Sequence, residues 1–396
     1  MPRPLEGTRI LAIEHFGAGP WGSMHLADLG ADVIKIENRR TGGDSARVVG
    51  PHLLGDGDSE FFQTMNRNKR SMSLDLKAPA GREVFEKLVA TADGITSNLR
   101  GDQPEKLKLQ YEDLVAINPR IVCAHISAYG RSGSRVTWPG YDYLMQGETG
   151  FMFLTGEPDG PPTRMGLSIV DWMTGMTNVL GLISGIMQAR ETGEGRNIDV
   201  SLFDTALFQT SYPAVWYLNE AYKTKRIARS AHPVLVPSQL YTAKDGWLYV
   251  MGLNEKFWDL IIEVIGRIDI AEDARFVDFE SRLKNRDALT GVLDEIFAEK
   301  TINDWIEIFA GRVPVGPVYD LDQALDSSFV AERGMVREFD HPMKGKLKVL
   351  ANPIRDNGEV LPVTRAPQLG EHTEEILREL GYSSQDIKDL SNDKVV

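Results

Sequence analysis

The first half of the chain alternates short apolar runs with stretches of helical periodicity, and no other feature of the sequence restricts the fold as strongly. The runs suited to strands lie at residues 9–13, 33–36, 121–126 and 197–201, and the helical stretches lie at 21–29, 81–92 and 172–190. Strands that alternate with helices form a largely parallel sheet, because each helix carries the chain back to the same edge of the sheet. The sequence therefore predicts an α/β fold with a doubly wound sheet.

The pattern changes at a connector between residues 222 and 236, which contains the charged run 223–226 and a proline at 233. Beyond it, Lys244-Asp245-Gly246 separates two apolar runs and predicts a β-hairpin. Helical periods follow at 255–265, 287–298 and 302–310. We therefore expect residues 1–222 to begin a large domain, residues 223–325 to form a small α+β domain, and residues 326–396 to return to the large domain.

Composition and charge restrict the classes of function. The formal net charge of the 396 residues is −13, which argues against a nucleic-acid binder, because such proteins need clustered positive charge to neutralise phosphates. Cys123 is the one cysteine, so an intrachain disulfide and a multi-cysteine zinc site are excluded. The chain shows no signal-peptide pattern, and its most apolar helical window, 172–187, is too polar and too short to span a bilayer. We expect a cytoplasmic protein that binds no metal, nucleic acid or membrane.

A glycine-rich turn between the first strand and the first helix matches a nucleotide-binding fingerprint. Gly17-Ala18-Gly19-Pro20-Trp21-Gly22 has the form GxGxxG, and Glu37 follows at the end of the next strand, at the spacing of about 20 residues that the fingerprint requires. Such glycines let a backbone approach a phosphate, and a strand-end acid can bond a ribose hydroxyl. Taken alone, the motif predicts an NAD-dependent oxidoreductase. The alternative is that the glycines only permit a tight turn and close helix packing.

Several separated blocks of the sequence resemble the family III CoA-transferases, the formyl-CoA transferase or CaiB/BaiF type. The blocks are residues 17–20, 29–37, 43–44, 68–71, 74–77, 166–171, 174–175, 192–196, 200–202, 365–367 and 369–373. Their order and spacing over residues 5–396 make the resemblance specific. It implies a Rossmann-like large domain that holds the adenosine diphosphate part of CoA, and an interlocked homodimer whose active sites lie between the large domain of one chain and the small domain of the other.

The resemblance also implies a covalent mechanism on Asp171. The Asp171 carboxylate attacks an acyl-CoA thioester to give a mixed anhydride, CoA thiolate then forms an aspartyl-CoA thioester, and an acceptor carboxylate completes the exchange. Asp171 lies just before the predicted helix 172–190, where exposed backbone N–H groups stabilise an anion. An aspartate in this position is also an ordinary helix cap, which is the alternative interpretation. The backbone near Gly17 and Ala18 is expected to donate to the oxyanion.

CoA is expected as a substrate, with no tightly bound cofactor. The residues that the resemblance places at CoA are His15, Gly17, Ala18, Arg39, Leu74, Lys77, Asn98, Leu99, Lys106 and Tyr141. Arg40 is the alternative to Arg39, because the loop differs in length from that of the family by one residue. Lys106 stands where the family usually has arginine, and lysine lacks the bidentate fork of arginine. The clearest basic cluster of the sequence, Arg67, Lys69 and Arg70, is consistent with binding of the CoA phosphates. The alternative, above all for Arg67, is a solvated turn.

Two departures from the family bear on the substrate. The glycine run in the small domain of formyl-CoA transferase is replaced by Val236-Pro237-Ser238-Gln239, so formate and oxalate are not assigned. A dicarboxylate such as succinate is expected by analogy. Tyr141 stands where the related α-methylacyl-CoA racemases carry histidine, and because a racemase needs two acid/base groups, this replacement argues against that alternative.

Overall fold

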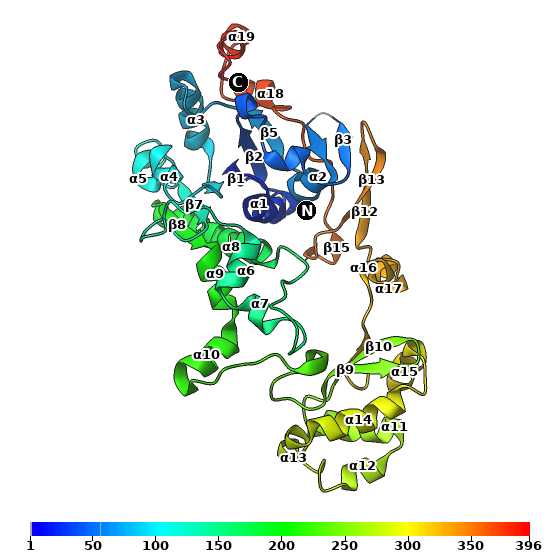
Figure 1. The fold of residues 1–396 in the computed structure, drawn as a ribbon. Helices are drawn as coiled ribbons and strands as arrows, with labels where there is room; N and C mark the ends of the chain where they lie inside the picture. Colours follow the sequence, from blue (N-terminus) through cyan, green and yellow to red (C-terminus); the bar gives the residue numbers. More distant parts are fainter. Residues whose placement is uncertain (1, 56) are drawn as a thin grey trace. The chain divides into compact units, whose positions relative to one another are not determined.

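The computed structural model describes residues 2–55 and 57–396 and divides the chain into two compact units (Figure 1). The first unit takes the residues up to Thr149 together with Met165–Ser211 and Ser328–Val396, and the second takes Gly150–Arg164 and Tyr212–Ser327.

The second unit is larger than the small domain expected from the sequence. It begins at Tyr212 rather than at residue 223, and it includes the segment 150–164. The side chain of Arg226 explains this inclusion, because it donates to the carbonyl oxygens of Pro161 and Gly160 at 2.8 Å each. These bonds join two segments that lie more than sixty residues apart, and a local sequence pattern does not reveal such a link.

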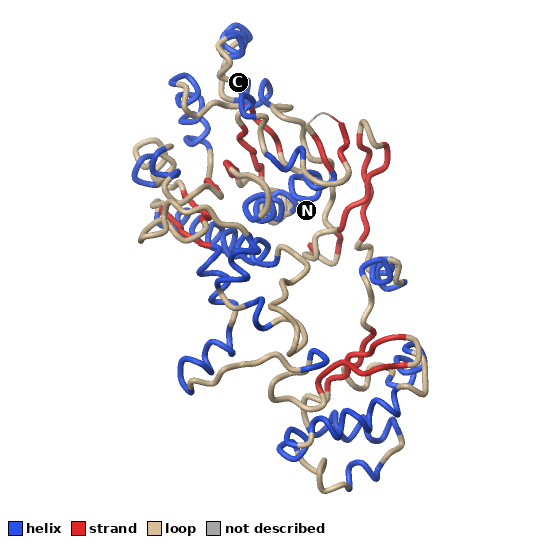
Figure 2. The backbone as a smooth tube through the Cα atoms, viewed as in Figure 1, coloured by secondary structure: helices blue, strands red, loops and turns tan. Residues whose placement is uncertain are grey.

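Six parallel strands form the sheet of the first unit, in the order β5-β2-β1-β6-β7-β8. Figure 2 draws the strands in red and the helices in blue. The strands are β1 Arg9–Ile13, β2 Asp32–Glu37, β5 Arg70–Ser73, β6 Gly94–Ser97, β7 Val122–Ser127 and β8 Arg196–Ser201. Numbered within this sheet alone, the order is 3-2-1-4-5-6, which is the order of the doubly wound nucleotide-binding fold. The predicted fold class is confirmed. Strand order reverses between β1 and β6, and ligands of such folds bind beyond the carboxyl ends of the strands at this point.

Each face of the sheet is covered by helices, as the alternation of side chains along β1 requires. Leu11 and Ile13 lie in a core with α3 (Pro79–Thr91) and the C-terminal helices α18 (Thr373–Glu379) and α19 (Ser384–Asn392). Figure 1 shows α18, drawn in orange, and α19, drawn in red, near α3 and β5 although they are far from both in sequence. Ile10 and Ala12 face the opposite core, beneath α1 (Ala18–Asp28) and α8 (Ile169–Thr192).

Helix α8 is longer than the sequence window suggests. It has 24 residues, and by length and composition alone it is long and apolar enough to cross a membrane, so the expectation that this stretch is too short for a bilayer is wrong. Its Val179, Leu182 and Ile186 are nevertheless buried against the sheet and α1. In the described structure α8 is therefore a core helix.

Shorter elements complete the first unit. They are the 3-10 turns Arg39–Thr41 and Ser45–Val48, the strands β3 Leu53–Gly55, β4 Asp58–Ser59, β12 Val336–His341, β13 Gly345–Leu350, β14 Arg355–Asp356 and β15 Glu359–Val360, and the helices α2 Glu60–Asn66, α4 Gln103–Lys106, α5 Tyr111–Leu114, α6 Asp142–Glu148, α9 Leu202–Gln209 and α17 Ser328–Glu332.

The second unit has its own antiparallel sheet, in the order β11-β10-β9, and its own core. Its strands are β9 Ser238–Ala243, β10 Gly246–Met251 and β11 Val315–Pro317. Its helices are α7 Phe151–Leu154, α10 Ser211–Glu220, α11 Glu255–Ile265, α12 Ile268–Glu272, α13 Phe279–Lys284, α14 Arg286–Phe297, α15 Ile302–Phe309 and α16 Leu321–Leu325. A 3-10 turn lies at Ala228–Ser230. The predicted hairpin is confirmed, since Ala243 pairs with Gly246 across a two-residue turn. The three predicted helices of this region are also present, as α11, α14 and α15.

Candidate active site

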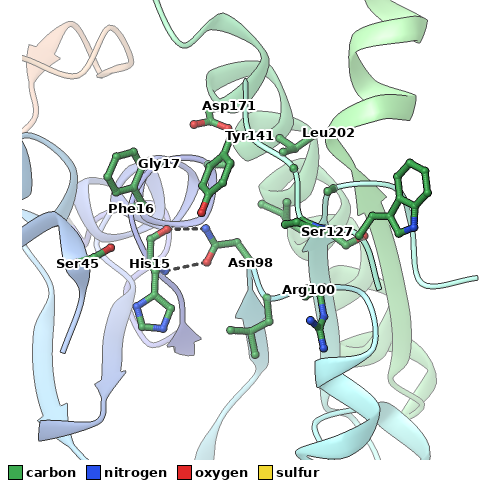
Figure 3. Close-up of a pocket in the computed structure, with 17 residues that line it drawn as sticks. His15, Phe16, Gly17, Ser45, Asn98, Arg100, Ser127, Tyr141, Asp171 and Leu202 are labelled. Carbon is green, nitrogen blue, oxygen red and sulfur yellow. Dashed lines mark hydrogen bonds between the residues drawn. The ribbon is translucent and has the colours of Figure 1, made fainter. Parts of the chain in front are cut away.

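A cavity of about 540 Å³ opens beyond the carboxyl ends of β1, β6 and β7, where the strand order reverses (Figure 3). Its walls come from the loop between β1 and α1, the segment after β6, the end of β7, the residues before α6 and the first turn of α8. Seven of the predicted site residues line it, namely His15, Gly17, Ala18, Asn98, Leu99, Tyr141 and Asp171. The fold thus brings the predicted nucleophile to the position where doubly wound sheets bind their ligands.

Asp171 lies against the loop that begins α1. A Cβ atom at Gly17 would overlap with Oδ2 of Asp171, so the absence of a side chain at Gly17 is what permits this approach. Helix α1 has no side-chain cap, and the N–H groups of Gly17 and Ala18 donate no hydrogen bond within residues 2–55 and 57–396. Free N–H groups at a helix N-terminus carry partial positive charge. The carboxylate and these donors therefore lie side by side at the cavity.

The ionisation of Asp171 is perturbed. Burial raises the pKa of its carboxyl group, the negative charge of Asp142 raises it further, and the result is a pKa of about 7. Within the described part of the chain the Asp171 carboxylate accepts no hydrogen bond, whereas its backbone N–H donates to the Asp142 carboxylate at 3.0 Å. A cavity-lining acid with a strongly raised pKa is a typical mark of a catalytic group.

Two polar residues of α6, Asp142 and Gln146, were not singled out by the sequence analysis. Both are buried, with 4% and 0% of their surface exposed. One signal in the sequence pointed to Asp142, its position directly after Tyr141. None pointed to Gln146, which follows one helical turn later in a stretch without a motif.

Asn98 holds the β1–α1 loop. Its side-chain Oδ1 accepts from the N–H of His15 at 2.8 Å, and its Nδ2 donates to the carbonyl oxygen of His15 at 2.6 Å, as the dashed lines in Figure 3 show. Both hydrogen-bonding groups of the amide therefore bind the backbone of this loop. Asn98 thus orients the loop that carries Gly17.

A buried ion pair supports the same loop from behind. Phe16 has a positive φ of 64°, a strained conformation for a residue with a side chain, and its N–H donates to Asp44 at 2.9 Å. Asp44 contacts the Lys35 ammonium group at 2.8 Å. Burial by itself would raise the pKa of Asp44, but Lys35 and the backbone donors outweigh burial and hold this pKa far below its usual range. Asp44 is therefore a charged anchor for the strained turn.

The basic cluster assigned to CoA phosphates has other partners, and that interpretation is corrected. Arg67 pairs with Asp28 at 2.8 Å and Lys69 with Glu14 at 2.8 Å, and all four side chains are nearly or fully buried. Arg70 is bonded to three carboxylates, those of Asp32, Glu375 and Glu379. Arg67 and Lys69 therefore neutralise buried acids, and Arg70 joins α18 to the sheet.

The dinucleotide fingerprint is also explained by internal contacts. Glu37 is 1% exposed and accepts from Arg47 at 2.8 and 2.7 Å and from Ser71 at 2.7 Å, so its carboxylate is not available to a ribose. A Cβ at Gly22 would approach the carbonyl oxygen of Gly175 to 2.7 Å. Gly22 therefore permits the close crossing of α1 and α8.

The remaining predicted CoA contacts do not line the cavity. Leu74 is 1% exposed and its side chain lies in the core beneath α3, so the match of residues 74–77 to a CoA channel segment stays a prediction. Arg39 and Lys77 are exposed on the segments that follow β2 and β5, at the same edge of the sheet as the cavity. Lys106 contacts Asp102 at 2.5 Å.

Arg100 is a cavity residue that the sequence analysis did not name. Its Nε contacts Asp102 at 2.6 Å, and Asp102 also binds Lys106. Two cations therefore share one carboxylate, which leaves net positive charge beside the cavity. Within the described residues no group of three or more His, Cys, Asp or Glu side chains is placed to hold a metal ion.

Comparison with known proteins gives consistent matches across the chain. The family model described as CoA-transferase family III matches residues 5–373. A human protein named succinyl-CoA:glutarate CoA-transferase is 32% identical over 397 residues, which cover 100% of this chain and 90% of that relative. A protein of Acetobacter aceti named acetyl-CoA:oxalate CoA-transferase is 33% identical over 372 residues, 93% of each chain. Among solved structures, a CaiB/BaiF family protein from Brucella suis has a TM-score of 0.81 and 34% identity, and the match covers 96% of this chain and 100% of that one.

Proposed function

The chain belongs to CoA-transferase family III and is a CoA-transferase, and we propose that it moves CoA from succinyl-CoA to a second dicarboxylate through a covalent intermediate on Asp171. One observation carries the proposal of the nucleophile. The Asp171 carboxylate faces the cavity without a hydrogen-bond partner in the described chain, beside the unpaired N–H groups of Gly17 and Ala18.

The proposed chemistry uses the carboxylate of Asp171 twice. One of its oxygen atoms forms a bond to the thioester carbonyl carbon of the donor, and the C–S bond breaks to release CoA thiolate. The thiolate then attacks the Asp171 acyl carbon, which frees the donor acid and leaves an aspartyl-CoA thioester. The acceptor carboxylate then attacks the aspartyl-CoA thioester, which releases CoA thiolate and forms a second mixed anhydride. The thiolate attacks the acceptor acyl carbon of this anhydride, which gives the CoA thioester of the acceptor and frees the Asp171 carboxylate.

Each of these steps passes through an oxyanion, and the backbone N–H groups at the start of α1 are the proposed donors. The helix terminus adds partial positive charge at the same place. Asn98 and Asp44 support this role, because they fix the loop without using the N–H groups of Gly17 or Ala18.

CoA is proposed to bind as a substrate along the cavity. His15, Leu99 and Tyr141 line the channel, and Arg100 adds a cation beside it. Arg39 and Lys77 are proposed contacts of the nucleotide end, because exposed cations at this edge of the sheet suit the phosphates of CoA. Lys106 is proposed to help through the charge that it shares with Arg100 on Asp102.

The identity of the acids rests on the relatives. Proteins named for glutarate and for oxalate have nearly equal identity to this chain, so similarity alone does not separate these acceptors. Both acids are dicarboxylates, and this shared chemistry supports a dicarboxylate acceptor.

The covalent step is tested by intact-protein mass spectrometry after mixing with succinyl-CoA and quenching with hydroxylamine or borohydride. We expect a mass change that maps to Asp171 and is lost in Asp171→Ala, while CoA binding remains. Transfer is then followed with succinate, glutarate and oxalate as acceptors. An Asp171→Ala variant that still transfers CoA would overturn the assignment of the nucleophile.

We further propose that the protein acts as a homodimer in the cytoplasm. Large apolar side chains on α8 and α9 support association, because Leu180, Met187 and Phe208 are 67%, 63% and 82% exposed. Light scattering after size-exclusion chromatography is expected to give twice the chain mass of 44.1 kDa. A monomer at micromolar concentration would contradict this proposal.

A further inference from the structure

Gln146 makes three hydrogen bonds with its one amide group. Its Nε2 donates to Oδ1 of Asp142 at 2.6 Å and to the carbonyl oxygen of Leu167 at 3.2 Å. Its Oε1 accepts from the N–H of Met165 at 2.9 Å. The side chain is fully buried, so water does not replace these bonds at low cost. Gln146 therefore ties α6 to the segment 165–168, which leads directly into α8.

Asp142 completes the link to α8. While its Oδ1 receives the Gln146 amide, its Oδ2 accepts from the backbone N–H of Asp171 at 3.0 Å. Ser168, the residue that precedes α8, makes no side-chain cap. A carboxylate from another helix thus occupies the place of a cap and satisfies a first-turn N–H group of α8.

This arrangement places the carboxylates of Asp142 and Asp171 close together, and each negative charge disfavours ionisation of the other group. The other ionisable side chains that line the cavity with Asp171 are His15, Arg100 and Tyr141, and Glu148 and Asp204 lie on α6 and α9, the helices packed against α8. Asp142 is nevertheless the one charged neighbour that acts on the pKa of Asp171, and it raises this pKa. The same group therefore both fixes the backbone of Asp171 and makes its carboxylate more basic.

We propose that Asp142 and Gln146 form a positioning pair that aims the Asp171 carboxylate into the cavity, a role that rests on the proposed covalent function. The pair uses the backbone N–H of Asp171 and leaves its carboxylate oxygens without partners. A nucleophilic carboxylate needs this arrangement, because every hydrogen bond that it accepts lowers its reactivity and has to break before attack. Neither residue touches the reacting atoms.

Asp142→Asn tests the electrostatic half of the pair. Asparagine keeps one oxygen that can accept the Asp171 N–H and removes the charge, but its amide nitrogen takes the place of the oxygen that accepts from Gln146. The rate of adduct formation with succinyl-CoA is measured from pH 5 to pH 9. In the wild-type protein we expect the rate to rise with pH through a midpoint near 7, the pKa of Asp171. In the variant we expect a lower midpoint, and a downward shift of about one unit would increase the fraction of the plateau rate reached at pH 5.5 by roughly 8-fold.

Gln146→Leu tests the positioning half, and Gln63→Leu is its matched control. Gln63 is also fully buried, and it likewise bonds an aspartate, Asp58, at 2.8 Å and a backbone N–H, that of Ala366, at 2.8 Å. It lies on α2 and does not line the cavity. We expect both variants to lose thermal stability, but only Gln146→Leu to lose 10-fold or more of the plateau rate of adduct formation, with little change in the Kd of CoA.

Equal plateau rates and equal pH midpoints in Gln146→Leu and Gln63→Leu would overturn the proposal, because the pair would then be merely structural. A second measurement keeps this result separate from failure of the proposed function. The pH dependence of the stability gained by Asp171→Asn reports the pKa of Asp171 without any catalysis. One outcome is that the wild-type protein forms no adduct but Asp142→Asn still shifts the pH at which Asp171→Asn gains stability. The proposed function would then fail, and the effect of Asp142 on the pKa of Asp171 would stand. If Asp142→Asn left this pH unchanged, the effect of Asp142 on the pKa of Asp171 would be refuted.

Discussion

Burial and the charge of Asp142 disfavour the ionised form of Asp171 in the folded chain. Its pKa is about 7 in the folded chain against an ordinary 3.8, so the folded state binds this proton more tightly than the unfolded state does. Ionisation of Asp171 therefore destabilises the fold: the penalty is absent below pH 4, grows between pH 4 and pH 7, and is complete above pH 7.

Asp171→Asn, which cannot ionise, is thus expected to abolish the adduct and to stabilise the protein at pH 8 by about 1 to 3 kcal/mol, a discounted fraction of the full three-unit shift. At pH 4 the two proteins are expected to be equally stable. Urea unfolding at the two pH values measures this difference. A variant that is less stable than wild type at pH 8 would show that the charge of Asp171 does not destabilise the fold.

Gly17 is the residue on which the approach of Asp171 to the loop depends. In Gly17→Ala the new Cβ overlaps with Oδ2 of Asp171, so the carboxylate has to turn away from the N–H groups of α1. We expect the rate of adduct formation to fall roughly 100-fold, the effect of a displacement of about 1 Å at a reacting group. Gly291→Ala is the control, because a Cβ there meets no atom within 4 Å, and it should keep the wild-type rate.

The sequence predicted those site residues whose role depends on their own loop. Asp171, Gly17 and Ala18 belong to blocks that follow or precede a predicted element, and the topology brings these blocks together. Asp142 and Gln146 were not predicted, because their role exists only once α6 packs against the start of α8. Lys69 was misassigned for a related reason, since its partner Glu14 lies 55 residues away.

At the scale of elements, the edge strand β5 and the central strand β6 were not predicted. Each has only four residues, and each contains serine or threonine, which breaks the apolar pattern on which a strand prediction relies. Their polar side chains are instead satisfied by neighbours, as in the bond of Ser71 to Glu37 at 2.7 Å. The longer elements with strong periodicity, such as α11 and β7, were predicted within one residue at each end.

The crossing of α1 and α8 sets the distance between the proposed oxyanion donors and the proposed nucleophile, because α1 carries the donors and α8 carries Asp171. Gly175 permits this crossing, since a Cβ there would lie 2.5 Å from the carbonyl oxygen of Ala18. We expect Gly175→Ala to push the helices apart, to lower stability by about 1 to 3 kcal/mol, and to lower the rate of adduct formation at least 10-fold.

Gly181→Ala is the matched control for this crossing. It lies on the same helix, but its Cβ would meet only the side chain of Ile198, at 3.0 Å, and a side chain can move aside. Thermal unfolding and stopped-flow acylation of both variants measure the two effects. If Gly181→Ala impaired acylation as much as Gly175→Ala did, the crossing would not be the cause.

At the scale of the whole molecule, the order of the six-stranded sheet is shared with NAD-binding proteins, so the fold alone does not identify the ligand. The side chains do distinguish a site for NAD from a site for CoA. The acid that would bind the ribose of NAD is bonded to Arg47, whereas exposed cations are available for the phosphates of CoA.

The chain is therefore expected to be stabilised by CoA and not by NAD. Saturation to 100 times the Kd contributes about 2.7 kcal/mol, which corresponds to a rise in Tm of roughly 5 °C for a unit of this size. The shift should persist in Asp171→Ala, because this residue is the proposed nucleophile and is not a proposed contact of the nucleotide. It should shrink in 0.5 M salt, because a chain with a net charge of −13 attracts an anionic ligand only through local cations. An equal rise in Tm with NAD would instead mean that the glycine-rich turn binds dinucleotides in general, and that selectivity for CoA arises only at the thioester.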